Sequence, residues 1–169
     1  MKDFIKIEKE NLMYLVLIII LIALDQFSKI AVQQMLSGRS SLPIINGIFH
    51  LTYVENRGAA FGLMQGKQII FAVVAAVVTV VGLVCIYKKT YGKLVNISIS
   101  LVIAGAIGNL IDRIKLGYVV DFLDFRFIWN YVFNLADVFV IVGTLTLCIS
   151  IIISDLKEGK KEKNNKKRV

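Results

Sequence analysis

The stretch Phe133-Asn134-Leu135-Ala136-Asp137 opens the last long apolar run of the chain. Asp137 lies inside this run, which continues without another charge to Ile153. A carboxylate held near the edge of a bilayer costs a few kcal/mol or more, so it is a functional candidate by default. Both the fold and the function have to account for this residue.

A second carboxylate lies upstream between apolar neighbours, in Val119-Val120-Asp121-Phe122. Two carboxylates within a few ångströms of each other cannot both ionise cheaply, so they share a proton and titrate in two separate steps. One can then accept a proton from water while the other donates one to a carbonyl oxygen, as in an aspartic protease. Alternatively, each carboxylate caps a helix or pairs with Arg113 or Arg126, and Asp124 competes with Asp121 for the role.

The composition favours a membrane protein. Hydrophobic residues make up 57% of the 169 residues, the mean hydropathy is +0.73, and the apolar residues occur in blocks rather than dispersed. The chain is too short for two membrane domains, so we expect one integral membrane domain over residues 1–169.

Four apolar runs are long enough to cross a bilayer. At about 1.5 Å of rise per residue, each approaches the roughly 30 Å of a hydrocarbon core, and helices are the only open-ended element that can span it. The first run has the basic start of a signal peptide but no small-residue cleavage site after it, so we expect it to remain as a span. The expected spans are residues 12–30, 69–87, 94–111 and 135–153.

Basic residues predict the orientation of these spans. The net charge is +8, and most of the 20 basic residues lie near the N-terminus, between the second and third runs, or in the tail 155–169. The positive-inside rule therefore places both termini in the cytoplasm and the segments 31–68 and 112–134 outside. A basic tail could also bind nucleic acid. In a membrane protein it favours anionic lipid, so we expect membrane lipids and no nucleic acid as partners.

The first outer segment predicts a small extracytoplasmic sheet, and the second carries aromatic residues. Residues 37–43 include the only proline of the chain and are typical of a turn. The stretch 48–54 is rich in β-branched and aromatic residues and predicts a strand. Tyr118, Trp129 and Tyr131 suit an aromatic belt at the membrane interface. The expected fold is an all-α membrane protein of four transmembrane helices with a small extracytoplasmic β-sheet.

Further polar residues lie near the outer ends of the spans. Asn134 is three residues before Asp137 and so shares its helical face, where it either orients that carboxylate or caps the helix. Asp25 and Lys29 have the i, i+4 spacing of an ion pair, which indicates a structural role. Asn109 and Arg113 follow a small-residue stretch suited to close helix contact, and we expect them to face other helices and brace the site.

A metal site is not indicated. The chain has two cysteines, both in apolar runs, and one histidine, without a CxxC or Cys/His cluster. Zinc requires three or four such ligands. We therefore expect no metal and no cofactor, and we interpret His50 as a solvated or interfacial loop residue.

Five motifs lie along the chain in this order: Asp25-Gln26-Phe27-Ser28-Lys29, Asn56-Arg57-Gly58-Ala59-Ala60-Phe61, Gly105-Ala106-Ile107-Gly108-Asn109-Leu110-Ile111-Asp112-Arg113, Val119-Val120-Asp121-Phe122 and Phe133-Asn134-Leu135-Ala136-Asp137. On these motifs the chain resembles lipoprotein signal peptidase, also called signal peptidase II, of bacteria. The resemblance extends from the first span to the fourth.

The resemblance implies an aspartic endopeptidase of the cytoplasmic membrane that acts near the outer face. Nothing in the sequence demands more than a monomer. Such an enzyme would remove signal peptides from prolipoproteins, cutting before a cysteine that carries diacylglyceryl. Asp121 and Asp137 match the family's catalytic aspartates, and Asp25 and Lys29 match residues that support its structure. The residues that match polar groups lining the family's site are Asn56, Asn109, Arg113 and Asn134.

Two other functions are compatible with buried carboxylates. A small proton-coupled transporter would use them as proton relays, but it predicts ionisable groups spread along a path through the membrane. A structural membrane subunit would use them for helix assembly and predicts mild effects when they are replaced. The clustering of the acids near one side favours the hydrolase.

Overall fold

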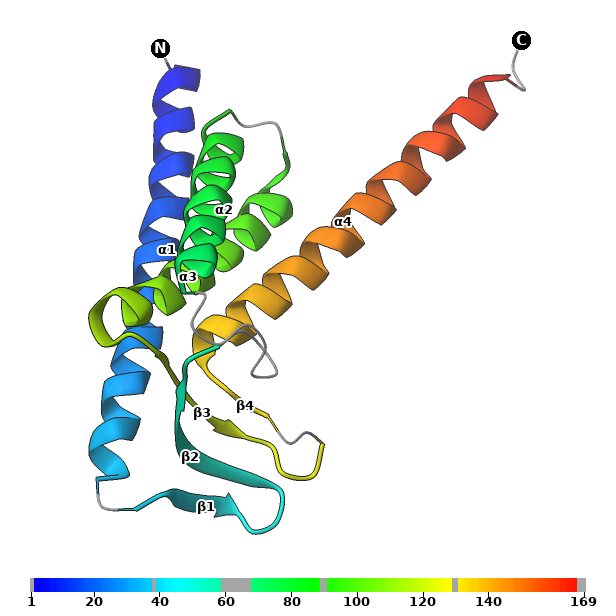
Figure 1. Ribbon diagram of the computed structural model, residues 1–169. Coiled ribbons are helices and arrows are strands. Elements are labelled where there is room, and N and C mark those ends of the chain that lie inside the picture. The colour runs from blue at the N-terminus through cyan, green and yellow to red at the C-terminus, as the bar shows by residue number, and fades with distance from the viewer. Residues whose placement is uncertain (1, 38, 59–67, 89–90, 129–130, 167–169) are drawn as a thin grey trace.

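The computed structural model describes residues 2–37, 39–58, 68–88, 91–128 and 131–166. These residues form a helical bundle with a small antiparallel sheet at one end (Figure 1). The helices are α1 (Lys2–Met35), α2 (Gln68–Lys88), α3 (Lys93–Leu116) and α4 (Leu135–Lys166). The strands are β1 (Ser41–Ile45), β2 (Phe49–Asn56), β3 (Val119–Asp124) and β4 (Val132–Phe133).

Each helix contains a segment long and apolar enough to cross a membrane, as the sequence predicted. The four segments are Asn11–Met35, Ile69–Lys88, Lys93–Leu116 and Leu135–Ser154. All four helices continue past the expected spans: α1 runs on to Met35, α2 to Lys88, α3 to Leu116 and α4 to Lys166. Asp112 ended the third apolar run in the sequence, but it does not end α3, because it is buried and paired with Lys29.

The sheet joins strands from the segments 31–68 and 112–134. Its strand order is β1-β2-β3-β4, with every neighbouring pair antiparallel. The central pairing of β2 with β3 sets Val54 opposite Asp121 and Asn56 opposite Val119. The predicted strand over 48–54 corresponds to β2. The predicted turn over 37–43 is wrong at its end, because Pro43 lies in β1. That strand is at the edge of the sheet, where a missing N–H is tolerated.

The sheet is fixed to the C-terminal end of α1 by a small apolar cluster. Val32 of α1 and Leu36, just after the helix, are buried against Phe122 of β3, with Leu42 and Leu51 of the first two strands packed beside them. A second cluster holds α1, α2 and α3 together within the bundle, and it contains Tyr14, Ile18, Ile86, Ile99, Ile103 and Ala104. The first cluster positions β3, and with it Asp121, relative to the helices.

Glycines let α3 approach its neighbours closely, as the small-residue pattern predicted. A Cβ on Gly108 would lie 2.6 Å from Oδ2 of Asp25 in α1 and 3.2 Å from Cβ of Ala136 in α4. Gly105 likewise faces the backbone of Ala136. The helix then ends at Gly117, whose φ of 79° is left-handed and whose N–H donates to the carbonyl of Arg113. This turn directs the chain into β3.

Beyond these contacts, α4 diverges from the other helices toward its C-terminal end (Figure 1). Aliphatic side chains along the spans, such as Ile19, Val80 and Leu145, are exposed. In water such a surface would be unfavourable, whereas in a bilayer it contacts hydrocarbon. The exposed apolar surface therefore agrees with the membrane assignment.

Candidate active site

Asp121 lies in β3 with only 2% of its surface exposed. Both of its carboxylate oxygens accept hydrogen bonds from asparagine side chains. Nδ2 of Asn134 donates to Oδ1 at 2.6 Å, and Nδ2 of Asn56 donates to Oδ2 at 2.8 Å. Asn56 is at the end of β2, and its Oδ1 also accepts the backbone N–H of Gly58 at 3.0 Å. The strand pairing and the two amides therefore fix this carboxyl group from both sides.

Asp137 lies in the first turn of α4 and is more accessible than Asp121. Its Oδ1 accepts from Nδ2 of Asn109 at 2.7 Å, and its Oδ2 accepts from the backbone N–H of Asn134 at 3.2 Å. In return, Oδ1 of Asn134 accepts the backbone N–H of Asp137 at 2.9 Å. This reciprocal pattern is a helix-capping arrangement, and the N-terminus of a helix favours a negative charge.

Two asparagine amides connect the aspartates. Nδ2 of Asn134 donates both to Asp121 and, at 3.1 Å, to Oδ1 of Asn109. Asn109 in turn donates to Asp137. The two roles considered for Asn134, capping the helix and orienting a carboxylate, are thus combined in one side chain. A hydrogen-bonded chain runs from Asp121 through both amides to Asp137.

The surroundings of Asp121 change its acidity. Burial, followed by the negative charge of Asp137, raises the pKa of Asp121 to about 7, while hydrogen bonds from Asn56 and Asn134 act in the opposite direction. A carboxyl group with this pKa can hold or release a proton near neutral pH, which suits general acid–base chemistry.

Arg113 lies one turn after Asn109 on α3 and contacts the site indirectly. Its Nη1 donates to the backbone oxygen of Asn109 at 3.3 Å, and its guanidinium lies over the ring of Phe71 of α2, 5.0 Å from the centroid. Its positive charge is near enough to both Asp121 and Asp137 to interact with them electrostatically. Its bracing role stays a prediction.

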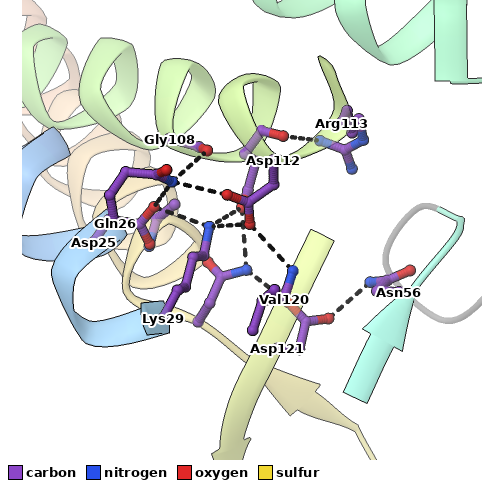
Figure 2. A network of polar contacts seen from close by, with 12 residues as sticks. Asp25, Gln26, Lys29, Asn56, Gly108, Asp112, Arg113, Val120 and Asp121 are labelled. Atoms are coloured by element: carbon purple, nitrogen blue, oxygen red, sulfur yellow. Dashed lines mark hydrogen bonds and ion pairs between the residues drawn. The ribbon is translucent and has the colours of Figure 1, made fainter. Parts of the chain in front are cut away.

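The predicted ion pair between Asp25 and Lys29 is confirmed, with a distance of 2.9 Å between Oδ2 and Nζ. The ammonium has two further partners, Oδ2 of Asp112 at 2.9 Å and Oδ1 of Asn109 at 3.1 Å (Figure 2). Gln26 completes the network by donating to Oδ1 of Asp112 at 2.8 Å. Sequence reasoning assigned no role to Gln26 or Asp112. The available signal was the i, i+3 spacing of Asn109 and Asp112, which places both on one face of α3.

Asp124, the competitor for Asp121, lies away from this network. It accepts from Thr52 at 2.6 Å and from Nε of Arg126 at 3.0 Å. Residues three apart in a strand point to opposite faces of the sheet, so Asp121 and Asp124 cannot share a site.

The prediction that His50 is a solvated loop residue is wrong. It is buried in β2, with its Nδ1 3.2 Å from Oγ of Ser41. Of the proposed aromatic belt, Tyr118 bonds to Tyr53 and Tyr131 is exposed, whereas Trp129 lies outside the described residues. Within the described part of the chain, no group of three or more His, Cys, Asp or Glu side chains is placed to hold a metal ion.

Comparison with known proteins identifies the family. Residues 17–153 match the family described as signal peptidase (SPase) II. The chain belongs to the signal peptidase II family. It is therefore a protease that removes signal peptides, and, like the family, it is a bacterial membrane protein.

Individual relatives support the same family. The chain is 55% identical over 146 residues to a lipoprotein signal peptidase of Clostridioides difficile, covering 86% of this chain and 99% of the relative. It is 48% identical over 137 residues to a lipoprotein signal peptidase of Halothermothrix orenii, covering 81% and 93%.

Solved structures agree with this assignment. A bacterial membrane enzyme solved by the in meso method at 2.3 Å resolution has a TM-score of 0.76 and 27% identity, over 85% of this chain and 89% of that one. A second, at 1.9 Å resolution, has a TM-score of 0.71 and the same identity, over 82% and 92%. The comparisons give no support to the transporter alternative.

Proposed function

We propose that this signal peptidase II acts on lipoprotein precursors and that Asp121 and Asp137 are its catalytic pair. The observation that carries the assignment is the chain of two amides, Asn134 and Asn109, which joins one oxygen of each carboxyl group. Carboxyl groups that serve only as helix caps or ion-pair partners would not need to be joined in this way. Neither forms an ion pair within the described residues, whereas Asp25 and Asp112 both bind Lys29.

The proposed chemistry uses one water molecule between the two carboxyl groups. Asp137, at the helix N-terminus, is the carboxylate that takes a proton from the water as its oxygen attacks the scissile carbonyl carbon. Asp121, the more buried member, carries the shared proton and donates it to the carbonyl oxygen. When the tetrahedral intermediate collapses, the C–N bond breaks, the leaving amine takes a proton from Asp137, and a hydroxyl group of the intermediate returns a proton to Asp121 as the new C=O bond forms.

The substrate class follows from the relatives and from the position of the site. Relatives up to 55% identical are lipoprotein signal peptidases, so we propose diacylglyceryl-modified prolipoproteins as substrates, cut before the lipid-bearing cysteine. The lipid tails would lie in the bilayer against the apolar helix faces. Asn56 and Arg113, beside the two aspartates, are the groups proposed to contact the peptide. Nothing in this scheme requires more than a monomer.

The proposed orientation places the site near the outer face and both termini in the cytoplasm. It is supported by the charge distribution and by the ribbon, in which the start of α1 and the end of α4 lie at the end away from the sheet (Figure 1). A single cysteine at Ser40, with Cys85 and Cys148 replaced by serine, should react with a membrane-impermeant thiol reagent added to intact spheroplasts. Labelling only after lysis would contradict this orientation.

The test of the catalytic pair is cleavage of a synthetic diacylglyceryl-cysteine peptide by purified enzyme in micelles. Asp121→Asn and Asp137→Asn should each lose roughly 10³-fold or more in kcat while remaining folded. Asp124→Asn is the matched control, because it removes a carboxylate from the same strand outside the site, and it should stay within about threefold of wild type. Wild-type activity in either of the first two variants would refute the assignment.

A further inference from the structure

Asp112 is a buried carboxylate with no part in the proposed chemistry, yet each of its oxygens is held by the surrounding elements. Only 4% of its surface is exposed. Oδ1 accepts from Nε2 of Gln26, while Oδ2 binds the ammonium of Lys29 and accepts the backbone N–H of Val120 at 3.1 Å (Figure 2). Val120 immediately precedes Asp121. Asp112 thus connects α3 by a hydrogen bond to the backbone beside Asp121, one member of the catalytic pair.

Asp25 makes the corresponding connection to the other member. It is fully buried, its Oδ2 binds Lys29, and its Oδ1 accepts the backbone N–H of Ala136 at 2.9 Å. Ala136 immediately precedes Asp137. Two buried carboxylates therefore hold the backbone one residue before each catalytic aspartate, one in β3 and one in α4.

Lys29 connects these two carboxylates to each other and to the amide chain of the site. Its ammonium is 2.9 Å from Asp25, 2.9 Å from Asp112 and 3.1 Å from Oδ1 of Asn109. An ammonium has three N–H groups, so these partners use all of them. The contact with Asn109 fixes the direction of that amide, with its oxygen toward Lys29 and its nitrogen toward Asp137.

We propose that Asp112 is a positioning residue for the reaction: with Asp25, on either side of Lys29, it sets the separation of Asp121 and Asp137 by holding the backbone before each. The proposal rests on the catalytic roles assigned above. Asp121 and Asp137 come from a strand and a helix that no continuous secondary structure joins. A catalytic constellation must be held within roughly 0.5 Å of its productive geometry. Charge-assisted hydrogen bonds to buried carboxylates supply that constraint.

A purely structural role is the competing explanation. Replacing a buried ion cluster by apolar side chains of similar volume is often neutral or stabilising, so stability alone is a weak reason for such a cluster. A positioning role makes a different prediction, because it requires the effect of a substitution to appear in turnover rather than in folding or substrate affinity.

The experiment compares Asp112→Asn with wild type and with Asp124→Asn. The asparagine keeps the shape of the side chain but removes its charge and one acceptor oxygen. For Asp112→Asn we expect kcat to fall roughly 10- to 100-fold, with KM within about twofold of wild type. For Asp124→Asn we expect the kcat and KM of wild type. Amide hydrogen exchange should accelerate at Val120 in Asp112→Asn and at Ala136 in Asp25→Asn. A kcat within twofold of wild type, or faster exchange spread evenly over the protein, would overturn the proposal.

A milder variant covers the case in which Asp112→Asn does not fold. Gln26→Met removes one donor from the network but leaves both carboxylates and Lys29, and it should lower kcat roughly 3- to 10-fold with an unchanged melting temperature. An unchanged kcat in this variant overturns the proposal. If the assignment of Asp121 and Asp137 as the catalytic pair is itself wrong, Asp121→Asn will be active, so the two failures can be distinguished. An inactive Asp121→Asn beside a fully active Asp112→Asn refutes the positioning role alone.

Discussion

The most informative single perturbation of stability is Asp121→Asn, because it should make the enzyme both inactive and more stable. Asparagine has the shape of a protonated aspartate but never ionises. The variant therefore retains the neutral form of the side chain at every pH. In wild type, by contrast, raising the pH forces a charge into a site where burial and the neighbouring Asp137 disfavour it.

The size and sign of the effect follow from the two pKa values. The pKa of Asp121 is about 7 in the folded protein, raised by burial and then by Asp137, against an ordinary value of 3.8. Between these values the folded state binds more protons than the unfolded state, so the free energy of unfolding falls as the pH rises. About 3 pH units at about 1.4 kcal/mol each give a loss of at most about 4 kcal/mol, complete above pH 7.

The assay is thermal unfolding in detergent at pH 4 and pH 8. Relative to wild type, the melting temperature of Asp121→Asn should be about 10 °C higher at pH 8 than at pH 4, because the acceptor oxygen that the variant lacks is missing at both pH values. Asp124→Asn is the control, because its stability should change in the opposite direction. Burial raises the pKa of Asp124, but hydrogen bonds from Thr52 and Arg126 outweigh it and hold that pKa below its ordinary value. That variant should lose stability at pH 8. A difference between Asp121→Asn and wild type that is the same at both pH values would refute the reasoning.

Three further predictions concern packing, the buried ion cluster and pH dependence. Gly108→Ala would place a Cβ 2.6 Å from Asp25 and should destabilise the fold by about 1–3 kcal/mol in thermal melts, whereas Gly92→Ala, with nothing within 4 Å, should change little. Lys29→Met leaves two buried carboxylates unpaired and should lower the free energy of unfolding by about 3–5 kcal/mol. An unchanged melting temperature would contradict the presence of this buried ion cluster. The pH–rate profile should decline above an apparent pKa near 7 as Asp121 loses its proton, so a flat profile between pH 6 and 9 argues against its role as acid.

The helical frame could be predicted because the bilayer imposes a simple rule. A spanning helix needs about 20 predominantly apolar residues, and all four helices contain a segment of about that length or longer that is apolar enough to cross a membrane. The ion pair of Asp25 with Lys29 was also predictable, since it depends only on the spacing within one helix. The close approach at Gly105 and Gly108 follows from the same kind of local pattern.

The parts that were missed depend on contacts between distant segments. Asp112 and Gln26 are partners across two helices, and no spacing within either helix indicates that contact. The strand β3 was not predicted because it is short and because it pairs with residues of β2 that lie more than sixty positions earlier in the sequence. Pro43 was assigned to a turn because a proline is usually excluded from a sheet, and only the sheet order shows that its strand is at the edge.

The central claim is that Asp121 and Asp137 act as one unit on one water molecule, and a double-mutant comparison tests it most directly. Single-turnover cleavage of the diacylglyceryl-cysteine peptide would be measured for Asp121→Asn, Asp137→Asn and the variant carrying both. Residues that act as a unit have strongly non-additive effects, so each single variant should lose roughly 10³-fold or more and the double variant little further. Two modest losses that multiply in the double variant would contradict a shared catalytic role.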